Sequence, residues 1–309
     1  MANTGDIRAV AFGGGSILLV GASFPVTGLL QGYPVLSGQA IRYAIGGLIL
    51  LGVLLARGRR LPMPGVRDLA GILGMVVAGM LGFNAAILVA ERYATPGFVT
   101  AVVGCTPLVL AIAVPMLARR RPAIAAVIGA AVVVGGVAVL TGGGSWHGPG
   151  LLLALACMAG EVLFTLCGIG PVQRLGAMET STWASFIAAV VGAGIATVVD
   201  GGAAWRLPTP TEGTALVVLG VFVTAVAFTG WYTCVAKIGA DRAGVLVGLM
   251  PVSGLVVSVL LHAQPLTVTA VVGAAAVAVG CTLGLYRRRV SDRPEPSEAR
   301  PELRQAARR

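Results

Sequence analysis

The stretches VVGCTPLVLAIAVPML at residues 102–117 and LVGLMPVSGLVVSVLL at residues 246–261 decide how this chain is organised. Each stretch contains the proline of a pattern, called a frame below, in which one proline is followed further along the chain by two glycines. The first frame consists of Pro107, Gly129 and Gly136, and the second of Pro251, Gly273 and Gly280. The spacing is 22 and then 7 residues in both frames, and the frames lie 144 residues apart. The chain therefore contains an internal repeat.

The composition places both copies in lipid. Of 309 residues, 57% are hydrophobic and 11% are charged, whereas soluble domains are about 45–50% apolar and about 25% charged. A soluble chain of this size has too few polar groups to cover so much apolar surface. The 45 glycines favour close helix packing, because small residues let helix backbones approach each other within a bilayer.

The apolar runs are long enough to be transmembrane helices, each of which needs about 20 residues. Ten runs are predicted, over residues 11–31, 36–56, 69–90, 97–118, 123–141, 150–169, 181–199, 213–235, 244–262 and 268–286. They lack the alternation typical of a β-barrel. We therefore expect an all-α integral membrane protein with ten transmembrane helices.

Lysine and arginine predict the orientation of these helices. With the N-terminus in the cytoplasm, nineteen of the 22 basic residues fall in inner segments. Only Arg92 and Arg206 fall outside, and Arg42 lies within the second run. This bias predicts a multi-pass protein of the cell membrane with both termini cytoplasmic. It also explains the net charge of +10 without nucleic-acid binding.

The repeat predicts two inverted halves. Five helices separate the copies, and an odd number turns the second copy upside down in the membrane. The basic link ARRRP at residues 118–122 accordingly corresponds to HAQP at residues 262–265, which has no arginine. Inverted repeats are typical of secondary transporters. The predicted organisation is one five-helix repeat over residues 1–141, a second over 150–287, and a disordered cytoplasmic tail over 288–309.

These features together resemble the EamA-type branch of the drug/metabolite transporter superfamily. The resemblance covers residues 7–287 and is carried by Arg42 with Tyr43, by residues 84–117, by the ARRRP link, by the repeated glycine frame and by GEVLFTL at residues 160–166. The sequence departs from the family where an acidic residue often precedes the last helix of each half, since Arg120 and Gln264 lie there. The resemblance implies transport of small metabolites, such as amino acids or drugs, often outward.

Glu161 is the first candidate site residue. It lies 11 residues beyond Gly150, roughly 16 Å along a helix at about 1.5 Å per residue, and so near the middle of the bilayer. A carboxylate there costs about 2.5 kcal/mol or more. We expect Glu161 either to carry a proton or bind an amine group, or to be a structural, hydrogen-bonded carboxyl.

Three further side chains are candidates for substrate binding or coupling. Arg42 either pairs with a carboxylate, from the substrate, Glu161 or Glu91, or extends its long side chain to the headgroups. Asn84 lies within the third run and hydrogen-bonds either a substrate or a neighbouring helix. Trp231, in the eighth run, either walls a binding site or packs in the core.

Prolines within apolar runs are candidates for helix kinks or gates. Pro25, Pro107 and Pro251 each remove a backbone donor, and the freed carbonyls either line a cavity or only shape the helix. No metal or cofactor is expected, because the five cysteines and two histidines lack ligand spacing.

The leading interpretation is therefore a secondary transporter that exports small organic metabolites by alternating access. No Gly-Lys-Ser/Thr phosphate loop follows the run Gly13–Gly14–Gly15, so we expect a gradient or substrate exchange to drive transport. The alternatives are a non-transporting membrane scaffold or receptor, and a membrane-embedded enzyme, for which the chain offers few polar groups. The G-x-x-x-G of Gly280 and Gly284 favours close packing, either within the chain or in a homodimer.

Overall fold

The computed structural model of the protein describes residues 4–30, 32–90, 92–94, 96–142, 144–260 and 266–285. All regular secondary structure in these residues is helical. Ten helical segments are long and apolar enough to cross a membrane. The predicted all-α integral membrane fold with ten transmembrane helices is therefore confirmed.

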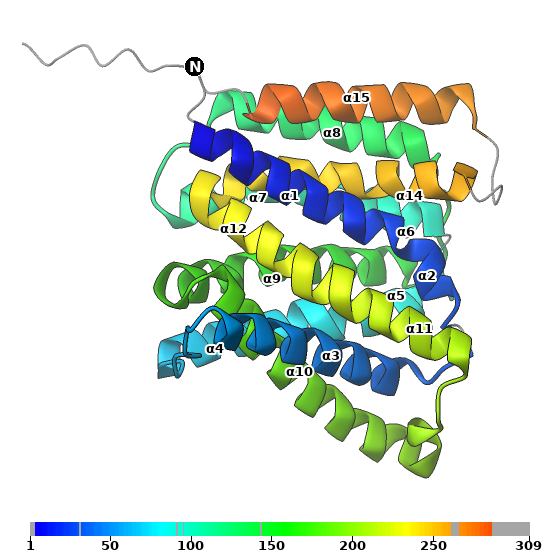
Figure 1. Ribbon diagram of the computed structural model, residues 1–309. Helices are drawn as coiled ribbons and strands as arrows, with labels where there is room; N and C mark the ends of the chain where they lie inside the picture. The colour runs from blue at the N-terminus through cyan, green and yellow to red at the C-terminus, as the bar shows by residue number, and fades with distance from the viewer. Residues whose placement is uncertain are drawn as a thin grey trace, which may run out of the picture.

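Several spans consist of more than one helical segment. The first five spans are α1 (Thr4–Ala22) with α2 (Phe24–Gly28); α3 (Val35–Ala56); α4 (Val66–Gly74), η1 (Met75–Gly82) and α5 (Phe83–Ala90); α6 (Pro96–Val103) with α7 (Thr106–Leu117); and α8 (Ile124–Thr141). The other five are α9 (Gly150–Leu175); α10 (Ala177–Asp200) with η2 (Gly201–Trp205); α11 (Pro210–Val218), η3 (Leu219–Ala227) and α12 (Phe228–Ile238); α13 (Ala240–Ala243), η4 (Gly244–Gly248) and α14 (Leu249–Leu260); and α15 (Val268–Leu285). Figure 1 shows these spans running between two ends of a bundle. We call the end at which α1 begins the near end, and the opposite end the far end.

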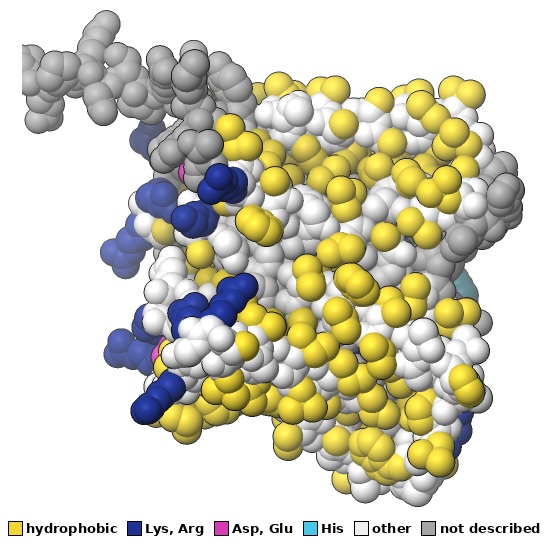
Figure 2. Space-filling view, viewed as in Figure 1, with side chains coloured by type: hydrophobic (Ala, Val, Ile, Leu, Met, Phe, Trp, Pro, Cys, Tyr) yellow, Lys and Arg dark blue, Asp and Glu magenta, His cyan; other side chains and the backbone are white. Residues whose placement is uncertain are grey.

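The surface of the bundle suits a bilayer. Apolar side chains cover the middle of the face shown in Figure 2, while Lys and Arg side chains gather at the near end. Large exposed apolar residues include Leu48, Val77, Val190, Phe222 and Val256. The near end is thus the end that the positive-inside rule assigns to the cytoplasm.

The two five-helix halves share the same interruptions. The third span of each half contains a π-helical segment, η1 or η3, and these segments begin 144 residues apart, at Met75 and Leu219. The fourth span of each half is also broken, at the turn between α6 and α7 and at the 3₁₀ segment η4. The repeat read from the sequence is therefore also a repeat of irregular backbone.

The last helices of the two halves, α8 and α15, pack against each other through the repeated glycines. A Cβ atom on Gly280 would lie 2.7 Å from the carbonyl oxygen of Gly129, and one on Gly136 would lie 2.9 Å from that of Gly273. The start of α8 thus meets the end of α15, so the helices are antiparallel. Only glycine permits so close an approach of two backbones.

The G-x-x-x-G motif of α15 is used within the chain. A Cβ atom on Gly284 would lie 2.8 Å from a methyl group of Val245, and Gly280 faces α8. Both glycines therefore pack against neighbouring helices of the same chain, and the motif gives a homodimer no support.

The three candidate prolines all lie near the start of a helical segment. Pro25 is the second residue of α2, and Ser23 separates α2 from α1. The side chain of Pro25 lies outside the described part of the structure. Pro107 lies in the first turn of α7, and Pro251 in the first turn of α14. Proline suits a first turn because its missing N–H would have no partner there. A role for these breaks in gating remains a prediction.

Candidate functional site

A cavity of about 670 Å³ lies at the far end, among α3, α5 and the last turn of α10. Its lining is mainly apolar and includes Tyr33, Leu36, Gln39, Leu81, Asn84 and Val89. Gln39 and Asn84 add two carboxamides to these walls, and Arg92 and Asp200 add one charged side chain of each sign. The volume lies in the range of about 300–1,000 Å³ that is typical of small-molecule sites.

The two carboxamides belong to a chain of hydrogen bonds that crosses the bundle. Gln39 donates to the Asn84 side-chain oxygen over 3.4 Å, and its own oxygen accepts from Arg42 over 3.3 Å. The Arg42 Nε atom also donates to the Thr224 hydroxyl, over 3.1 Å. At the other end of this series of hydrogen bonds, the Asn84 side chain donates to the backbone carbonyl of Met80. The cavity is thus connected to polar groups of both halves.

Both ends of this chain of hydrogen bonds lie on π-helical segments. Met80 belongs to η1 and Thr224 to η3. The Met80 carbonyl also accepts a weaker bond of 3.4 Å from the Tyr43 hydroxyl. π-Helical turns are rare and are frequently found at functional sites. The polar chain therefore joins the equivalent irregular segments of the two halves through α3.

Close packing of α3 against η3 brings Arg42 within reach of Thr224. A Cβ atom on Gly220 would lie 3.1 Å from the Arg42 carbonyl oxygen, so a larger residue would push the two backbones apart. A cation inside a membrane span is costly unless it is paired or hydrogen-bonded. Among the described residues Arg42 forms no ion pair, and its two hydrogen bonds offset part of that cost.

Glu161 lies elsewhere. It is partly buried on α9, and within the described part of the chain its carboxyl forms no hydrogen bond or ion pair. One turn further on, the buried hydroxyl of Thr165 also has no partner in the described residues. The Tyr232 hydroxyl of α12 donates to the Phe164 carbonyl over 2.8 Å. Glu161 thus lies beside a partly unsatisfied polar region between α9 and α12, and Arg42 does not pair with it. Glu91, the other suggested partner of Arg42, lies outside the described residues.

The sequence profile of the EamA-like transporter family matches residues 8–142 and again residues 148–286. The chain belongs to the EamA-like transporter family. The uncharacterized transporter YetK of Bacillus subtilis (strain 168) is 25% identical over 285 residues, which are 90% of this chain and 86% of YetK. An uncharacterized transporter of Archaeoglobus fulgidus is 22% identical over 257 residues, which are 81% of this chain and 88% of that protein.

A solved protein structure has the same fold. It superposes on this protein with a TM-score of 0.77 and a sequence identity of 23%. The superposed region covers 89% of this chain and 95% of the chain in the solved structure. The family and the ten spans make the protein a multi-pass membrane transporter. The resemblance inferred from the sequence is therefore confirmed at the level of the family.

In this EamA-like transporter the remaining candidates differ in their surroundings. Asn84 lines the cavity, whereas Trp231 is 4% exposed and lies in the main apolar core with Val235. Two residues that sequence reasoning missed, Gln39 and Thr224, complete the polar chain. Gln39 had a signal, because it lies three residues before Arg42 and so on the same face of one helix. Among the described residues no group of His, Cys, Asp and Glu is arranged to hold a metal ion.

Proposed function

We propose that the protein is a secondary transporter that exports a small organic metabolite, such as an amino acid or a drug-like compound, by alternating access. The observation that carries this proposal is the cavity of about 670 Å³ with Gln39 and Asn84 in its wall. Mainly apolar walls that also carry two carboxamides and the charged side chains of Arg92 and Asp200 suit a substrate that has an apolar body and a few polar groups. Membership of a transporter family supports transport but leaves the substrate open.

The position of the polar chain supports alternating access. Substrate that displaces the Gln39–Asn84 bond would disturb the contact between Arg42 and Thr224, and therefore the packing of the first half against the second. Rocking of the halves around such a shared site is the mechanism that inverted repeats permit. In this proposal Arg42 transmits substrate binding from the cavity to η3.

Glu161 is proposed as the coupling residue. It is a mid-span carboxyl without a partner among the described residues, and such groups often mark proton relays. The proposal predicts that movement of the substrate is coupled to movement of protons. In liposomes at a fixed membrane potential, substrate flux that ignores a pH gradient would exclude this role for Glu161.

The first experiment compares small molecules in the medium of cells that express the wild type, Glu161→Gln, Gln39→Ala or an empty vector. We expect one compound to accumulate outside only with the wild type, and less with Gln39→Ala. Glu161→Gln keeps the size of the side chain and removes its charge. If that variant matches the wild type, transport stands and Glu161 is structural.

The same experiment separates transport from the alternatives. A scaffold or a receptor would leave no solute whose distribution follows expression of the protein, provided that the protein reaches the membrane. An enzyme would consume one compound and form another, whereas a transporter changes only the distribution of one compound between the cell and the medium. We further propose the cell membrane as its location, with both termini in the cytoplasm, because basic side chains gather at the near end. Labelling of tags placed at the two termini, in intact and in opened cells, checks this orientation. A homodimer is a separate prediction, which the mass of the purified protein tests.

A further inference from the structure

At the near end, two ion pairs join one half of the chain to the other. Arg59, in the link between α3 and α4, pairs with Glu179 at the start of α10, with 2.5 Å between the charged atoms. Asp68, in the first turn of α4, pairs with Arg174 near the end of α9. Both carboxylates are buried, whereas both arginines are about half exposed. We call these four residues the near clamp.

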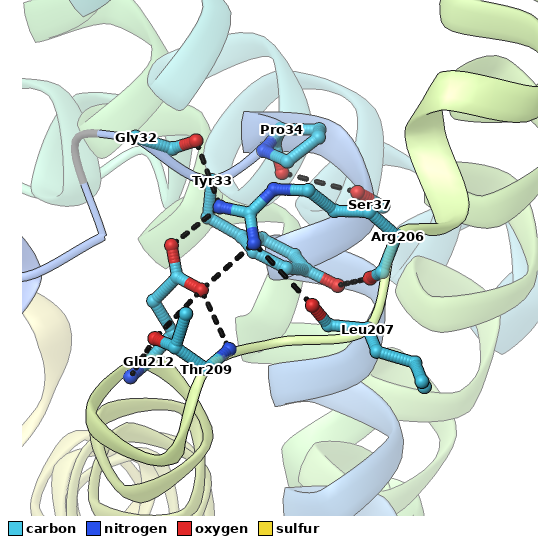
Figure 3. Close-up of polar contacts among 8 residues, drawn as sticks. All are labelled: Gly32, Tyr33, Pro34, Ser37, Arg206, Leu207, Thr209 and Glu212. Atoms are coloured by element: carbon cyan, nitrogen blue, oxygen red, sulfur yellow. Dashed lines mark hydrogen bonds and ion pairs between the residues drawn. The ribbon is translucent and has the colours of Figure 1, made fainter.

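At the far end, a second cluster also joins the halves (Figure 3). Arg206 donates to both carboxylate oxygens of Glu212 and, over 2.9 Å, to the carbonyl of Gly32. Its guanidinium lies over the ring of Tyr33, 4.6 Å from the centroid, and the Tyr33 hydroxyl donates to the Arg206 carbonyl over 3.0 Å. Burial raises the pKa of Tyr33 and keeps the hydroxyl protonated. We call these four residues the far clamp.

The two clamps occupy equivalent places in the repeat. Asp68 and Glu212 lie 144 residues apart, each in the first turn of the helix that opens the third span of its half. Each carboxylate accepts a hydrogen bond from the backbone N–H three residues earlier, that of Gly65 or Thr209. The segments contacted on the opposite half are equivalent as well. Asp68 pairs with Arg174, and Arg206, which Glu212 holds, contacts Gly32 and Tyr33. The 144-residue offset relates residues 29–34 to residues 173–178.

We propose that the near and far clamps are the opposed gates of this transporter: both are formed in the structure described here, and each is released in turn during the cycle while the other holds. This inference rests on the alternating-access function proposed above. Inverted halves exchange conformations during such a cycle. Equivalent contacts at opposite ends would therefore be made and broken in alternation.

The clamps differ in strength. The near clamp has two pairs of opposite charges across the halves, and the Trp183 indole also donates to the Pro62 carbonyl over 2.8 Å. The far clamp keeps its ion pair within the second half and reaches the first half only through a neutral carbonyl, a ring and a hydroxyl. Both clamps contain charge-assisted contacts, but among the described residues only the near clamp sets opposite charges against each other across the halves, and such pairs are the stronger kind. Gly32 and Tyr33 also line the cavity, so the weaker gate borders it.

A cysteine placed in the cavity tests the proposal. Leu81 lines the cavity and is buried, so the substitution Leu81→Cys gives a thiol that a membrane-impermeant maleimide can reach only when a gate opens. Labelling is measured separately from each face of sealed vesicles, and the same protein without the substitution supplies the background of the native cysteines. Two variants then perturb the clamps: Arg206→Ala removes the far clamp, and Arg59→Ala weakens the near clamp. Arg60→Ala is the matched control, because Arg60 is exposed and has no ion pair among the described residues.

We expect Arg206→Ala to speed labelling from the far side about two- to fivefold, the effect on a two-state equilibrium of losing the partly exposed contacts of this charged side chain with Gly32 and Tyr33. Arg59→Ala should slow labelling from the far side by a similar factor and speed it from the near side, while Arg60→Ala changes neither rate. The effect of Arg59→Ala is decisive, because Arg59 lies at the opposite end from the introduced thiol. Equal rates in all variants, or shifts of the same sign for both clamps, would overturn the proposal.

Two controls keep failure of folding and failure of the proposed function apart. The charge swap of Arg59→Glu with Glu179→Arg should return the labelling rates toward those of the wild type if the pair acts as a gate. If the wild type moves a solute but the clamp variants do not shift labelling, only the gate proposal fails. If the wild type moves no solute and the thiol is labelled from the far side alone in every variant, alternating access itself fails.

Discussion

Two neighbouring glycines of α8 allow a direct measurement of how tightly the halves are joined. Gly136 faces α15, where an added Cβ would lie 2.8 Å from the Val277 nitrogen and 2.9 Å from the Gly273 carbonyl oxygen. Gly135 faces outward, and a Cβ there would meet no atom within 4 Å. The variants Gly136→Ala and Gly135→Ala thus add the same methyl group to the same helix, one position apart.

The size of the expected difference follows from these distances. Non-bonded atoms pack best at about 3.5–4.0 Å, so Gly136→Ala must move α8 and α15 apart by roughly half an ångström or more. Overpacking of this kind costs about 1–3 kcal/mol. Gly135→Ala should instead stabilise the helix by about 0.5–1 kcal/mol, because alanine loses less backbone entropy than glycine. We therefore expect the free energies of unfolding of the two variants to differ by about 1.5–4 kcal/mol.

Thermal unfolding of the purified protein in detergent, followed by the fraction that remains monodisperse on gel filtration, checks this expectation. The Gly136→Ala protein should unfold at a lower temperature than the wild type, and Gly135→Ala at the same or a higher temperature. If Gly136→Ala were as stable as Gly135→Ala, the contact between α8 and α15 would not have the geometry described here.

Three further predictions follow from single contacts. Arg42→Lys should lower transport while the protein still folds, because one ammonium cannot serve both Thr224 and Gln39 as the guanidinium fork does; transport at the wild-type rate would show that the fork is not needed. Tyr232→Phe should lower stability by about 0.5–1.5 kcal/mol through loss of the buried bond to the Phe164 carbonyl, and an unchanged unfolding temperature would contradict that bond. High salt should speed labelling of the cavity thiol from the near side in the Leu81→Cys protein, because the near-clamp arginines are about half exposed and their pairs are screened. The same salt applied to the Arg59→Ala variant of that protein should have a smaller effect.

The sequence predicts the number and order of the spans well, because the cost of exposing polar backbone to lipid leaves few alternatives to long apolar helices. The ends of the spans are less predictable. The sixth span was expected to end at residue 169, before Pro171, but α9 continues to Leu175 with Pro171 inside it. Proline is tolerated in membrane helices where neighbouring groups satisfy the freed carbonyl, so Pro171 does not end this helix.

The candidate site was predicted only in part. Arg42 and Asn84 were found because polar side chains are rare within apolar runs, and the structure joins them through Gln39. The rotation of each helix about its axis is not visible in an apolar run, so the separation of Arg42 from Glu161 was not predicted. The π-helical segments have no signal of their own in composition.

The clamps had a signal that was missed. Extending the 144-residue offset toward the N-terminus aligns Pro64 and Asp68 with Pro208 and Glu212, each proline four residues before its carboxylate. The pairing partners of these carboxylates do not follow the offset, since Arg174 corresponds to Leu30. The repeat therefore predicts where the clamps lie but not which residues complete them.

The contact between α8 and α15 is, in its geometry, the interface of a two-fold symmetric dimer enclosed in one chain. In a true homodimer every residue appears twice, as an isologous interface requires. Here the counterpart of Glu161, 144 residues earlier, is Ile17. Joining two copies in one polypeptide thus allows a costly charge to be placed in the membrane once instead of twice, while the symmetric glycine contact that holds the copies together stays unchanged.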